Sequence, residues 1–119
     1  MTHSPKTYFL DIDGTLLKHV NNFQDTVHLE ELPILPEVLE KTGQWHCGGH
    51  TIIITTGRTE SMRAATELQL QNAGIVYDQL IMGLSQGVRV LVNDHTNSNE
   101  LKAEAYSVLR NVDGLKDVP

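Results

Sequence analysis

The chain contains one cysteine, Cys47, among its 119 residues, and this scarcity limits how the fold is stabilised. No intrachain disulfide can form, and no paired cysteine motif indicates a structural zinc site. Proteins of reducing compartments have this cysteine usage, so we expect a cytoplasmic protein. The apolar runs are a few residues long, far short of a membrane span, and we expect a soluble chain that is not exported.

Basic residues are also scarce, and this bears on the partners of the protein. Nine Lys and Arg stand against fifteen Asp and Glu, a formal net charge of −6. Nucleic-acid phosphates repel such a surface, so general nucleic-acid binding is disfavoured. Internal repeats and Gly/Ser linkers are missing as well, and we expect residues 1–119 to form a single domain.

Apolar runs alternate with helical patterns along the chain. The runs predict strands at residues 7–12, 50–55, 80–82 and 88–92. The patterns and their caps predict helices at residues 36–47, 60–73 and 97–109. Continuous apolarity, as in residues 52–54, is typical of strands covered on both faces. The order therefore predicts a three-layer, Rossmann-like, mostly parallel α/β sheet.

Polar side chains follow three of the predicted strands at the point where each ends. They are Asp11 and Asp13, then Thr56, Gly57 and Arg58, and finally Asn93 and Asp94. Ligands of open α/β sheets bind outside the carboxyl ends of the strands, so these groups should converge. Carboxylates suit Mg²⁺, which keeps several waters and accepts substrate phosphate as a ligand. Backbone N–H groups at a glycine turn suit the phosphate itself. The sequence thus predicts a site for magnesium and phosphate.

The segment 11–16, Asp-Ile-Asp-Gly-Thr-Leu after an apolar strand, resembles the first motif of the haloacid dehalogenase (HAD) superfamily. Its second and last motifs, apolar strands that end in Thr or in acidic residues, are matched at Thr56 and at Asp94. The resemblance implies that Asp11 is the nucleophile that becomes an aspartyl phosphate. It implies that Asp13 is the general acid and base, and that Thr56 binds the transferring phosphoryl group.

The resemblance also implies the remaining roles in the site. Asp94 would hold Mg²⁺ together with Asp11 and the carbonyl oxygen of Asp13. The residues expected at the phosphate are Gly14, Thr15, Gly57 and Arg58. For Arg58 two interpretations stand side by side, because it either orients phosphate or belongs to the first turn of the following helix.

Two features depart from the superfamily pattern. The superfamily places a lysine before its last motif, but no lysine occurs between Lys41 and Lys102, so Arg89 is the expected substitute. Asn93 also stands where an aspartate is common. The intervals between motifs leave little room for an inserted cap domain, which is typical of a capless member. Capless members of the superfamily act on bulky phosphorylated substrates, or a neighbouring subunit covers their site, so a homo-oligomer is one expectation. The sequence also resembles small capless phosphatases of sugar-phosphate metabolism, which makes a sugar phosphate a candidate substrate.

Two other functions compete with a Mg²⁺-dependent phosphatase. One is a non-catalytic phosphate-binding module with the same fold, which the missing lysine favours. The other is a receiver-type signalling domain, which accepts phosphate on an aspartate after its third strand. The third predicted strand ends here in Met82 and Gly83 rather than in an aspartate, so a receiver domain fits the sequence poorly.

Overall fold

The computed structural model describes residues 4–20, 29–97 and 100–119. Its elements in chain order are β1 (Thr7–Leu10), α2 (Val38–Cys47), β2 (Thr51–Thr55), the 3-10 helix η1 (Glu60–Met62), α3 (Arg63–Ala73) and β3 (Gln79–Ile81). The first three predicted strands and the first two predicted helices are therefore confirmed, although η1 forms the start of the second helix. Gly74, with φ of 79°, ends α3 as the glycine pattern predicts.

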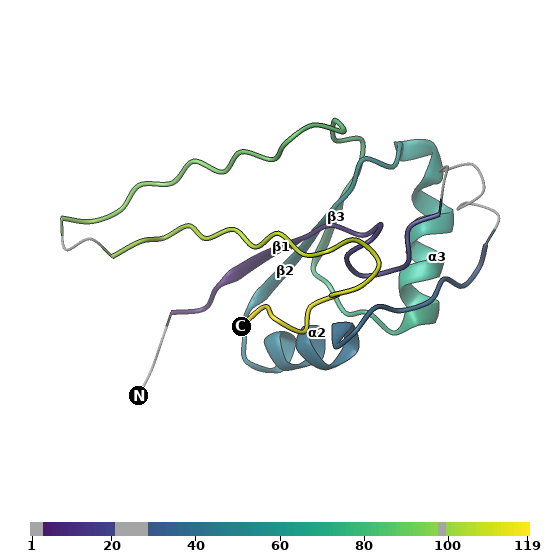
Figure 1. Cartoon of the computed structure of the whole chain (residues 1–119), viewed down its shortest axis with the longest axis horizontal. Helices are drawn as coiled ribbons and strands as arrows, with labels where there is room; N and C mark the ends of the chain where they lie inside the picture. Colours follow the sequence, from purple (N-terminus) through teal and green to yellow (C-terminus); the bar gives the residue numbers. More distant parts are fainter. Residues whose placement is uncertain (1–3, 21–28, 98–99) are drawn as a thin grey trace.

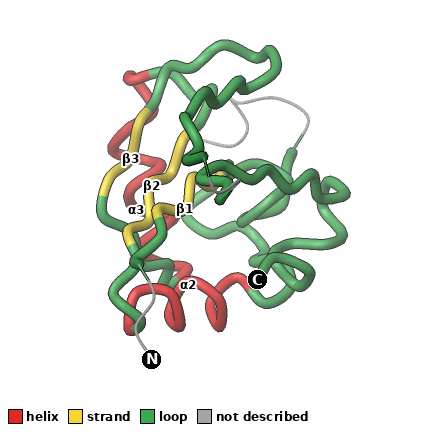
Figure 2. Tube along the Cα trace, turned by 90° about the vertical axis from the view of Figure 1, so that its left-hand side faces the viewer, coloured by secondary structure: helices red, strands yellow, loops and turns green. Residues whose placement is uncertain are grey.

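The sheet is parallel, with strand order β1-β2-β3, and it has one well-covered face. Consecutive parallel strands with right-handed crossovers carry their connecting helices on the same side, so α2 and α3 share a face (Figure 2). Trp45 of α2 stacks on Tyr8 with ring centroids 3.8 Å apart. On the opposite face, Phe9 and Ile81 are 55% and 40% exposed. The observed fold is α/β with a parallel three-stranded sheet and the helices α2 and α3, which confirms the predicted fold class, although no helix of the described residues covers the opposite face.

The opposite face lacks a covering helix because residues 84–97 and 100–109 leave the body as an arm (Figure 1). We call residues 84–97 its outgoing limb and residues 100–109 its returning limb. The predictions of a strand at 88–92 and a helix at 97–109 are wrong for the described residues, which have no regular structure there. A strand needs a hydrogen-bonding neighbour, and a helix of this length is marginal unless its apolar face is packed. In the described residues the outgoing limb has no paired strand. On the returning limb Val108 packs in part against the core, but Leu101 and Leu109 stay 74% and 62% exposed.

Both ends of the arm are held on the body by backbone hydrogen bonds. At the outgoing end, Gly83 N–H donates to the Arg58 carbonyl at 2.7 Å. At the returning end, Asn111 N–H donates to the Gly14 carbonyl at 2.9 Å. The last residues then form turns that bury Leu115 and Val118 against the core. The arm is therefore an excursion between two anchored segments, and it contributes to a longest extent of 49 Å.

The described residues show no inserted cap. Between Asp13 and Thr56 they form α2 and β2, and between Arg58 and Arg89 they form η1, α3 and β3. Of the helices in the described ranges, none is long and apolar enough to cross a membrane. The prediction of a single domain over residues 1–119 stays a prediction.

Candidate active site

The loop after β1 is built on one buried residue. The carbonyl oxygen of Ile12, itself fully buried, accepts the N–H groups of Thr15, Leu16 and Leu17 at 3.1, 2.9 and 3.1 Å. Gly14 supplies the positive φ of 89° that this tight turn requires. The turn fixes the backbone on both sides of Ile12, so the side chains of residues 11 and 13 have defined positions.

Asp11 presents its carboxylate to solvent at the end of β1. Its Oδ2 accepts a hydrogen bond from the Thr15 hydroxyl at 3.2 Å. Desolvation by the surrounding chain raises the pKa of Asp11, and the charge of Asp13 raises it further. The Thr15 hydrogen bond and the Arg89 charge lower that pKa but do not cancel the rise. Asp11 thus has the exposure and chemical character of a nucleophile or metal ligand that is not locked in an ion pair.

Asp13 is bound instead to Arg58, from the turn after β2. Arg58 Nε donates to Asp13 Oδ2 at 3.0 Å, and Nη2 donates to Oδ1 at 2.8 Å. The pair is nearly dry, because the Arg58 side chain is fully buried and that of Asp13 is 9% exposed. A two-point pair of this kind fixes the carboxylate plane as well as its position.

The remaining contacts of Arg58 come from α3. Its Nη1 donates to the Thr66 hydroxyl at 3.0 Å and to Gln69 Oε1 at 2.5 Å. Buried in this way, Arg58 has no surface from which to contact a substrate phosphate, so the predicted phosphate-binding role is not the one its position supports. It links β1, β2 and α3 from inside. Sequence reasoning missed Thr66 and Gln69, although two polar residues three apart on the buried face of a helix were the available signal.

Thr56 and Gly57 lie at the end of β2, beside the end of β1. The pairing of Leu10 with Ile54 places both strand ends at one edge of the sheet, as predicted. The Thr56 side chain is buried, and its Oγ1 accepts the Arg58 backbone N–H at 3.1 Å. A Cβ on Gly57 would come within 2.8 Å of Gln86 Nε2, so the base of the arm passes close to this turn.

Arg89 and Asp94 lie on the outgoing limb and are exposed. Arg89 Nη1 donates to the carbonyl oxygens of Ser85 and Gly87, both at 2.8 Å, while its charge still acts on Asp11. Asn93 Nδ2 donates long contacts of 3.3 Å to the carbonyl oxygen and to Oδ1 of Asp94.

The predicted metal ligands therefore come together only in part. Within residues 4–20, 29–97 and 100–119, no three His, Cys, Asp or Glu side chains are grouped closely enough to hold a metal ion. Asp11 supplies an accessible carboxylate oxygen, which suits a hard cation such as Mg²⁺. Asp94 does not join it, because the segment that precedes Asp94 is not paired to the sheet.

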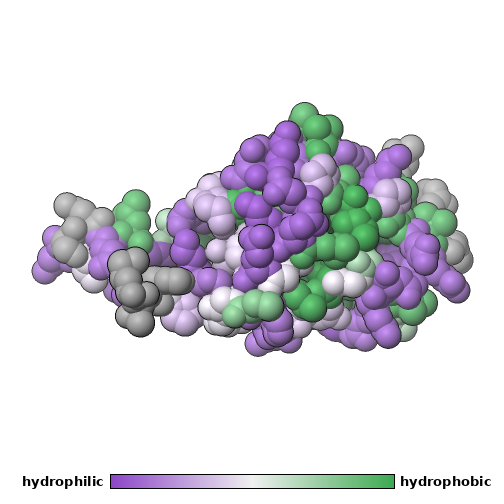
Figure 3. Space-filling view, turned by 90° about the horizontal axis from the view of Figure 1, so that it is seen from below, coloured by the Kyte–Doolittle hydropathy of each residue, from purple (hydrophilic) through white to green (hydrophobic). Residues whose placement is uncertain are grey.

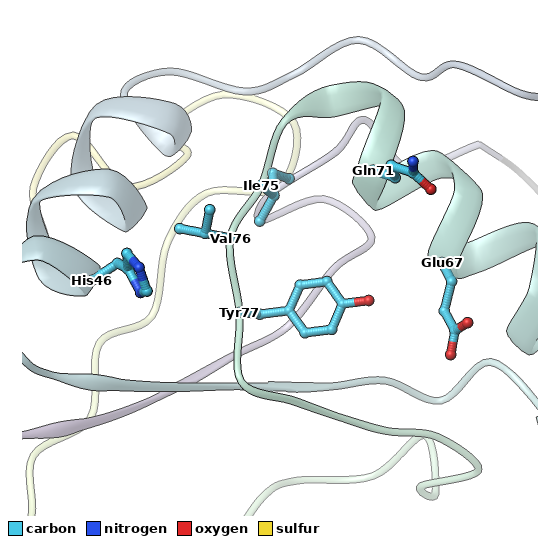
Figure 4. Close-up of a pocket in the computed structure, with 6 residues that line it drawn as sticks. All are labelled: His46, Glu67, Gln71, Ile75, Val76 and Tyr77. Atoms are coloured by element: carbon cyan, nitrogen blue, oxygen red, sulfur yellow. The ribbon is translucent and has the colours of Figure 1, made fainter.

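A surface pocket of about 470 Å³ lies elsewhere on the molecule (Figure 4). Its lining combines the end of α2, the outer side of α3 and the segment before β3: His46, Glu67, Gln71, Ile75, Val76 and Tyr77. Burial raises the pKa of Tyr77, and the charge of Glu67 adds to the effect. The predicted site residues do not line this pocket, which adjoins the segment entering β3 rather than the strand ends.

Solved structures share this fold and define the class of protein. Two are described as a Pnkp1/Rnl/Hen1 complex and as the Pnkp1/Rnl/Hen1 RNA repair complex. Their TM-scores are 0.60 and 0.59, with 25% and 27% identity, over 76% and 71% of this chain and 32% and 28% of theirs. A Vibrio cholerae protein matches at 19% identity with a TM-score of 0.53, over 71% of this chain and 78% of its own. The chain has a HAD-like α/β fold.

The sequence comparison narrows this class to a family. The family model described as HAD superfamily, subfamily IIIB (acid phosphatase), matches residues 1–118. The chain belongs to this family of phosphomonoesterases, and the resemblance drawn from its first motif is confirmed.

Curated relatives of the chain come from a plant. The stem 28 kDa and stem 31 kDa glycoproteins of Glycine max are each 33% identical to it over 96 residues. Each alignment covers 67% of this chain but only 38% and 33% of the two relatives. The chain thus spans about a third of the length of these proteins.

Proposed function

We propose that the protein hydrolyses phosphomonoesters through a covalent intermediate on Asp11. The observation that carries this proposal is the position of Asp11: it is the exposed carboxylate at the end of β1, oriented by Thr15 and free of any ion pair in the described structure. An Asp11 oxygen attacks phosphorus, and the bond from phosphorus to the ester oxygen breaks. Water then cleaves the aspartyl phosphate and releases inorganic phosphate.

Asp13 is proposed to protonate the leaving oxygen and later to remove a proton from the attacking water. In this structure both of its oxygens accept hydrogen bonds from Arg58. Each carboxylate oxygen keeps a second lone pair, so Asp13 can still accept a proton from water. Donation to the leaving group requires the Asp13–Arg58 pair to loosen, and this makes Arg58 a positioning residue for Asp13.

Asp11, the carbonyl oxygen of Asp13 and Asp94 are the groups proposed to hold Mg²⁺, which the HAD superfamily generally uses. When bound, the ion offsets the repulsion between the Asp11 carboxylate and the phosphate dianion. Thr56, Gly57, Gly14 and Thr15 are the proposed phosphate contacts, and their common position at the strand ends supports them. Thr15 and Gly57 are partly exposed, whereas Thr56 and Gly14 are buried and become accessible only if the loops open.

The proposed substrate is a bulky phosphorylated molecule or a sugar phosphate. An exposed Asp11 and the lack of a cap among the described residues support an open site that a large ester can approach. We also propose that the protein works in the cytoplasm, which its single cysteine supports.

Phosphate release from para-nitrophenyl phosphate tests the reaction. We expect turnover with Mg²⁺, and we expect Asp11→Asn to abolish it while the fold is retained, because the amide has nearly the same shape. Asp117→Asn is the matched control, since this carboxylate is exposed and far along the chain from the site. Wild-type activity in Asp11→Asn would show that the nucleophile is another residue.

A metal titration tests the assignment of Asp94 separately. Asp94→Ala should raise the Mg²⁺ concentration required for half-maximal activity, because one ligand oxygen is removed. An unchanged titration removes Asp94 from the metal site.

The second candidate function is a non-catalytic phosphate-binding module. The engagement of Asp13 by Arg58 and the separation of Asp94 from Asp11 favour it. Saturable binding of inorganic phosphate with no turnover of any ester would support the module over the enzyme.

A further inference from the structure

The arm carries apolar side chains that a stable protein does not normally leave in water. On the outgoing limb, Val88 is 89% exposed, Val90 is 81% exposed and Val92 is 87% exposed. In Figure 3 the projecting part of the molecule is mostly hydrophilic and carries one small hydrophobic patch. Contiguous exposed apolar residues in an extended segment are typical of a surface that another element covers. The limb has the sequence pattern of a strand and follows an extended path in Figure 1, but in the described structure it is not paired with a strand.

The sheet has an edge strand, β1, that lacks a partner on its outer side in the described structure. In the described structure β1 pairs with β2 on one side only, so its other side is an open parallel edge. Phe9, on the uncovered face of β1, is 55% exposed. Open edges of this kind recruit a further strand through their unpaired backbone groups. The limb and the edge of β1 both have unpaired backbone groups, and both carry exposed apolar side chains. Pairing of the two would satisfy the backbone groups and bury the side chains.

The chain cannot bring its own limb to this edge in the parallel sense. Only six residues, 82–87, separate the end of β3 from Val88. A parallel neighbour must start at the amino end of the sheet, and a return to that end takes about a dozen residues or more. In Figure 1 the outgoing limb instead runs in the direction opposite to β1. The short connection keeps the limb away from its own sheet.

We propose that two copies of the chain exchange their arms, so that residues 88–92 of each copy pair with β1 of the other. A two-fold axis perpendicular to the strands reverses direction, so a limb that runs opposite to its own β1 runs parallel to that of its partner. The exchange covers the valines and closes both open edges. No connection has to be lengthened for it to form.

The exchange also completes the catalytic site from two chains. A strand parallel to β1 delivers the residues that follow it to the carboxyl end of β1, beside Asp11. Asp94 of the partner subunit then lies at Asp11, which Asp94 of the same chain does not reach in this structure. This assignment of Asp94 rests on the proposed function, whereas the exchange itself rests on the limb, the edge and the connection.

The first experiment measures the exchange without using activity. Light scattering after gel filtration should give twice the chain mass of 13.3 kDa. Pairing that places residue 94 beside residue 11 also places residue 90 beside residue 7. In a Cys47→Ser background, refolded mixtures of Thr7→Cys and Val90→Cys chains should be joined by a short bis-maleimide. Mixtures of Leu68→Cys, on α3, with Val90→Cys should not. A monomer, or a dimer that cross-links only through Leu68→Cys, overturns the exchange.

A longer connection gives a second test of the same proposal. A flexible insert of about twelve residues after Gly87 would let the limb reach its own β1, so the dimer should become a folded monomer. Val90→Asp combined with Val92→Asp should also shift the mass toward the monomer, because both charges would lie in the paired strand. A dimer that persists in both variants is held by another surface, and the proposal fails.

The last experiment tests the shared site by complementation. Asp11→Asn and Asp94→Asn chains are refolded separately and together in equal amounts. With exchange, half of the dimers are mixed and each holds one intact site, so the mixture recovers about a quarter of wild-type activity. The assay is run at a Mg²⁺ concentration at which Asp94→Asn alone shows no turnover. Without exchange every site keeps one defect, and the mixture shows no more activity than the two variants measured separately. An inactive wild type refutes the proposed function, while the cross-linking result still decides the exchange.

Discussion

Arg58 and Asp13 form a buried ion pair that joins the turn after β2 to the loop after β1. Its two hydrogen bonds are 3.0 and 2.8 Å long, and the arginine is fully enclosed. Removal of one member of such a pair leaves an uncompensated charge in a dry environment. The pair therefore stabilises the two loops that carry the proposed nucleophile and phosphate contacts.

Arg58→Ala should lower the free energy of unfolding by about 3–5 kcal/mol, because Asp13 and Gln69 lose their partner. Arg63→Ala is the matched control. Arg63 makes partly exposed ion pairs with Glu60 and Glu67, so its loss should cost about 1 kcal/mol or less. Urea denaturation compares the two.

If Arg58→Ala does not fold, Thr66→Val tests the same group of buried hydrogen bonds with a smaller loss of stability. It removes one hydrogen bond to a charged group and should cost about 1.5–3 kcal/mol. Equal stabilities for wild type, Arg58→Ala and Arg63→Ala would contradict the importance of the buried pair.

Asp11→Asn should stabilise the fold at neutral pH. The pKa of Asp11 is raised in the folded chain, so the folded state disfavours the carboxylate relative to the unfolded state. The stability associated with its protonated form is present below the ordinary pKa of 3.8 and is lost as pH rises through the folded value. The gain from Asp11→Asn should therefore be seen at pH 7 and vanish below the ordinary pKa. Thermal unfolding across pH tests this, and a gain confined to acid pH would contradict it.

Arg89→Ala should lower kcat, with little change in melting temperature, if the catalytic arrangement is the one seen within a single chain. In the exchanged pairing Arg89 lies beside residue 6, and the effect on kcat should be small. The side chain is exposed and bonds only to nearby carbonyls in the described structure, while its charge reaches Asp11. Preorganised cations at a developing phosphate charge contribute several kcal/mol to rate, on the order of a hundredfold or more. Arg89→Lys should recover part of the rate. If kcat is unchanged in Arg89→Ala, the cation at the intermediate comes from another residue.

Gly114→Ala should destabilise the fold by about 1–3 kcal/mol. A Cβ at this position would lie 2.4 Å from the Pro36 carbonyl oxygen, and the φ of 54° disfavours any larger residue. Gly43, inside α2, has open space at its Cβ position. Gly43→Ala should therefore stabilise by about 0.5–1 kcal/mol, because alanine is the better helix former. Melting temperatures that move in the same direction for both variants would contradict this packing.

The sequence by itself determined the parts of the protein that depend on local signals. Apolar runs and glycine caps predicted β1, β2, β3 and both helices. The segment 11–16 also predicted the family and the strand-end position of Asp11, because motif and strand are contiguous in the chain. The tertiary structure decided what depends on contacts between distant residues. Arg58 turned inward because Asp13, Thr66 and Gln69 together satisfy its charge in a buried space.

Residues 88–92 have the apolar composition of a buried strand, and the sequence predicts one there. Whether such a segment is buried depends on the reach of the connection before it, and six residues are too few for a parallel return within one chain. An apolar pattern predicts that a segment will be buried. It does not predict whether the same chain or a second copy buries it. For this reason the local pattern predicted a fourth strand that the described residues do not form. It also predicted that Asp94 lies beside Asp11, and the structure of one chain does not bring the two together.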